Sequence, residues 1–150
     1  MASEFRFITV SSLEKIFEEE SFKPQFLLLE DSMLFGERYS FQAAYCLKGT
    51  SPIRVMVQAG GTLAKHVIIR KVDSVPSKVP ADAEQDEPVL RTTPGRYPDI
   101  LLPLNKPFEI LPNQWGSLWI TIPETCTLPA GKYELQLSIV EEQTGEVIGR

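Results

Sequence analysis

The sequence predicts an all-β fold, an antiparallel β-sandwich of about seven to nine strands, immunoglobulin-like or related. Apolar and polar residues alternate at period two in several short runs, which is the spacing of strands with one buried face. Prolines and glycines separate these runs and favour turns between them. Because amphipathic strands cannot bury their apolar faces alone, we expect two sheets packed against each other.

The first half of the chain contains four predicted strands, at residues 5–10, 39–47, 53–59 and 67–75. The short turn around Pro52 between the second and third of these runs predicts a hairpin. Residues 12–20 carry apolar side chains at helical spacing, so this segment is predicted either as a short helix or as a continuation of a twisted strand.

Residues 76–112 contain eight of the twelve prolines in the chain. Proline lacks the backbone donor that a central strand needs, so we predict a long irregular loop here. Short edge segments are expected within it only at residues 89–92 and 108–111. A loop of this length in a compact domain is usually functional or contacts something.

Two further strands are predicted at residues 115–122 and 133–139. In the first of them Leu118, Ile120 and Ile122 share one face, so Trp119 is expected to point away from the core. A bulge at Gly116 would reverse this assignment. A last strand begins at residue 147 and the chain stops within it, so we expect residues 1–150 to be one domain from a longer protein.

The composition excludes several classes of function. Hydrophobic residues make up 43% and charged residues 23%, which is typical of a chain that folds around a core. A net charge of -5 disfavours nucleic acid and anionic membrane surfaces as partners. No apolar run approaches the ~20 residues that cross a bilayer, and the N-terminus lacks the pattern of a secretion signal. We therefore expect a cytoplasmic location.

Familiar catalytic patterns are absent from the sequence. There is no glycine-rich phosphate loop, no cluster of cysteine and histidine, and no Gly-x-Ser-x-Gly turn. His66 is the one histidine, and we interpret it as a surface residue rather than a general base. Cys46 and Cys126 are interpreted as packing residues, and whether they pair is left open. We expect no metal, no cofactor and no catalysis by this chain.

Trp119 and Trp115 are the first candidate binding residues. A tryptophan that points out of the sandwich is covered by residues 76–112, covered by another domain, or exposed as a platform for sugar. Aromatic rings suit the C–H faces of sugars and are also frequent anchors of protein interfaces. All three possibilities remain open at this point.

A second group of candidates lies in residues 91–99. Arg91, Arg96, Tyr97 and Asp99 could form a polar recognition surface. The alternative is a buried Arg–Asp pair that pins the loop to the domain.

Four segments together resemble a known family. They are SSLEKIF (residues 11–17), GERYSFQAAY (36–45), PGRYPDILLP (94–103) and QWGSLWIT (114–121). They are similar to the N-terminal β-sandwich domain of bacterial glycoside-hydrolase-like multidomain proteins of the Gram-positive type. The turn and strand at residues 129–133 also recur in accessory sandwiches of bacterial glycosidases. The resemblance implies that a catalytic-type domain, similar to a (β/α)8 barrel, follows Arg150 and holds any catalytic residues.

Two hypotheses for the function follow. The first is a non-catalytic accessory domain that braces the following catalytic domain through Trp119, Tyr97 and Trp115, with Arg91 and Asp99 beside them. The alternative is a free-standing carbohydrate-binding module that uses exposed aromatic rings.

Overall fold

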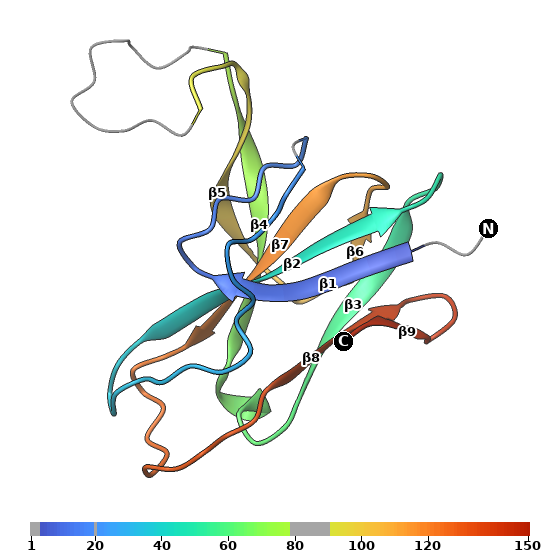
Figure 1. Ribbon diagram of the computed structural model, residues 1–150. Helices are drawn as coiled ribbons and strands as arrows, with labels where there is room; N and C mark the ends of the chain where they lie inside the picture. Colours follow the sequence, from blue (N-terminus) through green and yellow to red (C-terminus); the bar gives the residue numbers. More distant parts are fainter. Residues whose placement is uncertain (1–3, 20, 79–90) are drawn as a thin grey trace.

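The computed structural model describes residues 4–19, 21–78 and 91–150. Nine strands form two antiparallel sheets that pack as a sandwich (Figure 1). The predicted all-β sandwich of seven to nine strands is therefore confirmed. Within the described residues there is no α-helix, and the one helical turn is the 3-10 helix η1, Ala64–His66. These residues also include no helix long and apolar enough to cross a bilayer.

The first sheet has the strand order β1-β2-β7-β4-β5 and the second has the order β6-β3-β8-β9. The strands of the first sheet are β1 (Glu4–Ser11), β2 (Tyr39–Lys48), β7 (Trp115–Ile122), β4 (Ile68–Ser77) and β5 (Gly95–Pro103). Those of the second are β6 (Phe108–Ile110), β3 (Ile53–Gly60), β8 (Gln136–Glu141) and β9 (Val147–Gly149).

The main core lies between the two sheets. Its buried residues come from four strands and the short β6: Ala43, Tyr45, Leu47, Val55, Ile110, Leu118, Ile120, Leu137 and Ile139. The inward face predicted for β7 is thus correct. Tyr45 lies opposite Gly116 in an unbroken register between β2 and β7, so the bulge that would have reversed the faces is absent.

The predicted hairpin between residues 39–47 and 53–59 is wrong. β2 pairs with β1 and β7 in the first sheet, whereas β3 pairs with β6 and β8 in the second. The short connection at residues 49–52 therefore passes from one sheet to the other. Alternation reports which face of a strand is buried but carries no information about its hydrogen-bonded neighbours.

Residues 76–112 are also more regular than predicted. Gly95–Pro103 forms β5, which pairs with β4 along its length and has a bulge opposite Asp73 and Ser74. β5 is an edge strand, and an edge strand tolerates proline because its outer side needs no ladder donors. The expected edge segment at residues 108–111 is confirmed as β6. Of the expected segment 89–92, residues 89 and 90 lie outside the described residues, and the remaining two are not in a strand.

Candidate functional site

Residues 12–28, which we call the strap, cross the outer face of the first sheet and return (Figure 1). Apart from residue 20, which is not described, the strap is irregular, so both the helix and the continued strand predicted for residues 12–20 are wrong. The strap begins in a turn where Leu13 N donates to Ser11 Oγ over 3.2 Å. Ile16 and Phe22 point down from it and are buried against the sheet.

A buried glutamine of β2 holds the start of the strap. Gln42 is 4% exposed, and its Nε2 donates to the carbonyl oxygen of Glu14 over 2.8 Å. Its Oε1 accepts a hydrogen bond of 3.1 Å from Ser117 Oγ on β7. A buried amide without hydrogen-bond partners would destabilise the fold. The strap carbonyl and the Ser117 hydroxyl supply the partners of the Gln42 amide.

Charged and aromatic contacts hold the far side of the strap on β5. Arg96 Nε lies 2.9 Å from Glu18 Oε2, and Arg91 Nη2 lies 3.7 Å from Glu19 Oε2. Phe17 packs edge-on against Tyr97 with 5.8 Å between the ring centroids. The strap therefore spans the sheet from the β1 edge to the β5 edge.

Arg91 and Tyr97, two of the sequence candidates, meet in this anchor. The Arg91 guanidinium lies 5.1 Å from the ring centroids of both Phe17 and Tyr97, which is a cation–π distance. The Tyr97 hydroxyl donates to the carbonyl oxygen of Thr93 over 2.5 Å. Both side chains are thus used within the chain to fasten the strap, although Tyr97 stays partly exposed.

Asp99 lies apart from these residues. It falls at the bulge of β5, between Pro98 opposite Ser74 and Ile100 opposite Asp73, and it is exposed. A buried Arg–Asp pair, one of the two alternatives from the sequence, therefore does not hold residues 91–99 on the domain. Glu18 and Glu19 take that role.

Trp115 is covered by its own chain. Its side chain points to the outer face of the sheet but is only 7% exposed. Phe22 of the strap packs edge-on against the indole at 5.3 Å, and the Arg6 guanidinium lies 5.4 Å from its centroid. Trp115 therefore presents no open ring, because the strap adds a layer that the sequence pattern did not reveal.

Trp119 also lies on the outer face, as predicted, and is half-buried. In the sheet it is flanked by Gln42 of β2 and Arg70 of β4. Part of its indole therefore remains available to a partner.

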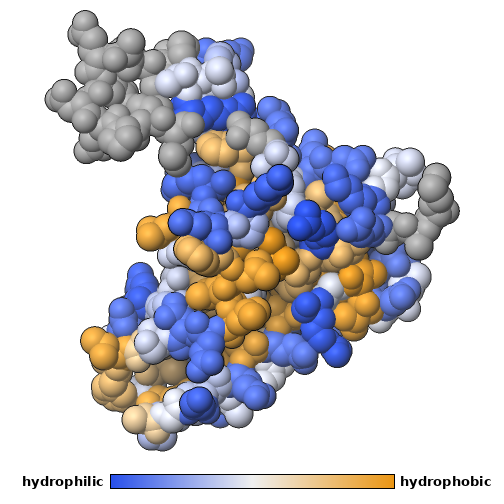
Figure 2. Space-filling view, in the orientation of Figure 1, coloured by the Kyte–Doolittle hydropathy of each residue, from blue (hydrophilic) through white to orange (hydrophobic). Residues whose placement is uncertain are grey.

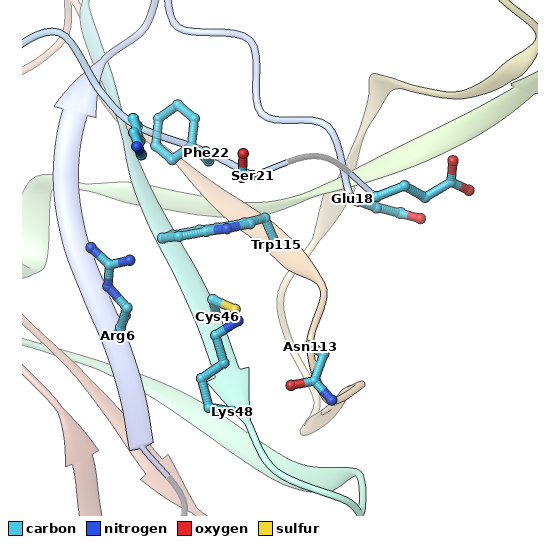
Figure 3. Close-up of a pocket in the computed structure, with 10 residues that line it drawn as sticks. Arg6, Glu18, Ser21, Phe22, Cys46, Lys48, Asn113 and Trp115 are labelled. Carbon is cyan, nitrogen blue, oxygen red and sulfur yellow. The ribbon is translucent and has the colours of Figure 1, made fainter.

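Two cavities flank Trp115. The first, of ≈ 280 Å³, is lined by Arg6, Glu18, Glu19, Ser21, Phe22, Lys23, Cys46, Lys48, Asn113 and Trp115 (Figure 3). The second, of ≈ 450 Å³, is lined mainly by Glu18, Tyr45, Lys71, Asp73, Arg96, Glu109, Gln114 and Trp115. Glu18 and Trp115 border both.

The lining of the first cavity comes from both sides of the Trp115 indole plane. Phe22 lies on one side of the indole plane, whereas Arg6, Cys46, Lys48 and Asn113 lie on the other (Figure 3). The cavity therefore places cationic and amide groups beside an indole that is 7% exposed.

The second cavity reaches the phenol of Tyr45. Burial raises the pKa of this phenol, and the carboxylates of Asp73 and Glu18 raise it further. Tyr45 is therefore a neutral hydrogen-bonding group at physiological pH. Lys71 and Asp73 at the cavity wall lie 3.6 Å apart, as an ion pair.

The chemistry of a metal centre or a thiol catalyst is not assembled in the described residues. They contain no group of three or more histidine, cysteine, aspartate and glutamate side chains placed to hold a metal ion. Cys46 and Cys126 are both free thiols. Burial raises the pKa of the Cys46 thiol, which keeps it protonated and unreactive. His66 has a buried Nε2 atom without a hydrogen-bond partner in this part of the chain.

Sequence reasoning missed the residues of the strap that complete this site. Phe17, Glu18, Glu19 and Phe22 were not candidates, because nothing in their segment indicates a binding pattern. Gln42 and Ser117 alternate with core residues, so they lie on the outer faces of β2 and β7. Their burial shows that a further layer covers these faces, but the burial itself is known only from the structure.

No family model matches this chain, and no curated protein matches it. Solved structures match its fold. One of them comes from a structural analysis of a family 123 glycoside hydrolase from Clostridium perfringens, concerned with glycolipid glycan hydrolysis. The two chains are 14% identical with a TM-score of 0.55, and the match covers 75% of this chain and 20% of that chain. This chain thus spans about a fifth of the length of that protein, and the likeness shows a shared fold.

Proposed function

We propose that this chain is a non-catalytic accessory β-sandwich of a glycoside-hydrolase-type protein, and that it packs against a catalytic domain that follows Arg150. The observation that carries the proposal is the fold match, which takes up most of this chain but only 20% of a family 123 glycoside hydrolase chain. The four sequence segments that resemble the N-terminal sandwich of such proteins support the same assignment.

The surface of the sandwich supplies apolar anchors for such an interface. Inter-domain interfaces of several hundred Å² per side need apolar side chains at their centre. Large apolar residues that are 54–87% exposed gather in and next to the strap: Leu13, Phe26, Leu27, Leu29, Leu34 and Phe35. Figure 2 shows apolar surface in a broad band across the middle of the side that carries β1. We place the docking surface here, with the half-buried Trp119 as a further anchor.

The reading frame of the gene beyond Arg150 gives the first test. The proposal expects the frame to continue into a domain of barrel size, and a frame that ends at Arg150 would overturn it. In the longer protein, Leu29→Ser combined with Phe35→Ser should uncouple the two domains in calorimetry. Val147→Ser, a 42% exposed residue on β9, is the matched control and should leave the coupling intact.

A free-standing carbohydrate-binding module is the second candidate, and the two cavities beside Trp115 favour it. An open platform that uses the rings of both Trp115 and Trp119 is not available, because Trp115 is 7% exposed. Binding would instead use the cavities. Glycan-array binding by this chain alone supports the module, and no binding across a broad polysaccharide panel rejects it. The cytoplasmic location stays a prediction, which cell fractionation tests.

A further inference from the structure

The second cavity lies where β4 separates from β7. The register between these two strands ends with Val72 opposite Ser117, whereas β4 continues to pair with β5 to its own end. The β4–β5 pair therefore extends beyond the rest of the sheet (Figure 1). Trp115 and Gly116, the first two residues of β7, have no partner in β4, and the cavity of ≈ 450 Å³ borders both of them.

The phenol of Tyr45 forms part of the wall of this cavity. Tyr45 is 4% exposed, and a Cβ atom added to Gly116 would lie 2.6 Å from its hydroxyl oxygen. Burial raises the pKa of the phenol, and the nearby carboxylates of Asp73 and Glu18, which also line the cavity, raise it further. The hydroxyl end of Tyr45 is therefore the part that borders the cavity, and it makes no hydrogen bond to a described residue. A buried hydroxyl is unfavourable unless a ligand or a water bonds to it.

Two more polar groups of the cavity have no partner within the described residues. The side-chain amide of Gln114 makes no hydrogen bond there, and the Glu109 carboxylate makes neither a hydrogen bond nor an ion pair. With the Tyr45 hydroxyl, the cavity thus offers a phenol, an amide and a carboxylate. A ligand hydroxyl both donates and accepts, so it can bond to each of these three groups.

The cations of the cavity are already paired. Lys71 Nζ lies 3.6 Å from Asp73 Oδ1, and Arg96 Nε lies 2.9 Å from Glu18 Oε2. With Glu109, three carboxylates line the cavity against two cations. An anionic ligand would therefore meet no unpaired positive charge, and the free hydrogen-bonding groups favour a neutral ligand rich in hydroxyls.

We propose that the second cavity binds a neutral sugar ring, whose hydroxyls bond to Tyr45, Gln114 and Glu109. Apolar lining residues, among them Val72 and Leu111, supply surface for the C–H groups of the ring. The volume of ≈ 450 Å³ lies within the roughly 300–1,000 Å³ of sites for small ligands and accommodates a monosaccharide. This inference rests on the second candidate function, the carbohydrate-binding module, and does not require a following catalytic domain.

Titration of the full 150-residue chain, followed in amide NMR spectra, tests the ligand class. The probes are glucose, galactose and mannose, with glucuronate and glucosamine as the anionic and cationic comparisons. At least one neutral sugar should bind more tightly than both charged sugars and should shift the amide signals of Gln114 and Gly116. The proposal fails if no neutral sugar binds, if a charged sugar binds as tightly, or if the shifts lie only outside the cavity.

Tyr45→Phe locates the binding, because it removes the hydroxyl and keeps the ring. It should weaken binding of the preferred sugar by about two- to tenfold, the loss of one hydrogen bond. The melting temperature should not fall, since the hydroxyl has no partner among the described residues. Tyr133→Phe is the matched control. Its hydroxyl donates to the carbonyl oxygen of Pro129 and lines neither cavity, so its loss should leave the affinity unchanged.

Three results with these variants would overturn the site. They are an unchanged affinity in Tyr45→Phe, an equal loss of affinity in both variants, and a lower melting temperature of Tyr45→Phe, which would mean that the hydroxyl bonds within the chain. If the chain binds on a glycan array and Tyr45→Phe leaves that binding unchanged, the carbohydrate-binding function stands and only this location for it fails.

Discussion

Glu18 and Arg96 join two segments that lie 78 residues apart, through a hydrogen bond of 2.9 Å from the guanidinium Nε to the carboxylate Oε2. Each residue also contacts the sheet through other atoms. Arg96 Nη2 donates to the carbonyl oxygen of Ser74 over 3.1 Å, and the backbone nitrogen of Trp115 donates to the carbonyl oxygen of Glu18 over 3.2 Å. This pair therefore holds the strap over β7 and β5.

We expect Glu18→Gln to loosen the strap. The side chains of Glu18 and Arg96 are 22% and 43% exposed, so solvent screens their attraction. The free energy of unfolding should fall by about 0.5–1 kcal/mol, measured by urea denaturation. Amide hydrogen exchange in residues 12–28 should accelerate more than in β7. Glu142→Gln, which breaks the Arg54–Glu142 pair on the second sheet, should leave exchange in the strap unchanged, and an effect there would contradict the assignment.

Phe22→Ala should be far more destabilising than Phe26→Ala, although the two residues lie four positions apart. Phe22 is 8% exposed and packs on Trp115, whereas Phe26 is 75% exposed. Truncating a buried phenylalanine costs about 3–5 kcal/mol, and the irregular strap should place this one near the lower end. Tryptophan fluorescence of the Phe22 variant should shift to longer wavelength, because Trp115 becomes exposed to solvent. Similar stabilities of the two variants would show that the strap does not pack on the sheet.

Gly116→Ala should destabilise the sandwich. A Cβ atom at Gly116 would lie 2.5 Å from Cζ of Tyr45, so the buried tyrosine ring would have to move. Overpacking of this kind typically costs about 1–3 kcal/mol in the free energy of unfolding. Gly60→Ala is the control, because its nearest neighbours would be 3.9 Å away.

A smaller side chain at position 45 should remove the clash. We expect Gly116→Ala to cost less in a Tyr45→Leu background than in the natural sequence, because the ring that it meets is gone. If Gly116→Ala lowers the free energy of unfolding equally in the two backgrounds, measured by thermal or urea unfolding, the destabilisation does not come from contact with the Tyr45 ring.

The stability of the fold should fall in acid through Glu124. The hydrogen bond from Arg38 lowers the pKa of Glu124 from its ordinary value of 4.5 to about 2. A carboxyl group whose pKa is lowered by folding stabilises the folded state above its unfolded pKa, and this contribution is lost as the pH falls. Glu124→Gln should therefore flatten the dependence of unfolding free energy on pH between about 4.5 and 2. Arg38→Gln should flatten it similarly, and an unchanged slope in both variants would show that the pair does not form in solution.

Much of the fold was predictable because alternation is a local property. The strands at residues 5–10, 39–47, 53–59 and 67–75 appear in the structure with small changes at their ends. The strand predicted at residues 133–139 is shifted towards the C-terminus and runs from Gln136 to Glu141. Its inward Leu137 and Ile139 nevertheless reach the core as their spacing requires.

The candidate site was only partly predictable because its parts come from distant segments. The sequence indicated Tyr97 and Arg91 as parts of a polar recognition surface. Their partners Phe17 and Glu19 lie in a segment that has no regular structure. Trp115 was assigned to the correct face. Its burial could not be foreseen, since it depends on Phe22 reaching across the sheet.

By itself the sequence determined the class of the fold, most of the strands and the inward face of β7, because each depends on side chains two residues apart along one strand. Only the tertiary structure decided that β2 and β3 belong to different sheets, that residues 95–103 pair with β4, and that the strap covers Trp115. Which strands pair and which segment covers a sheet depend on contacts between residues far apart in the chain. These contacts produce no periodic pattern within any single segment.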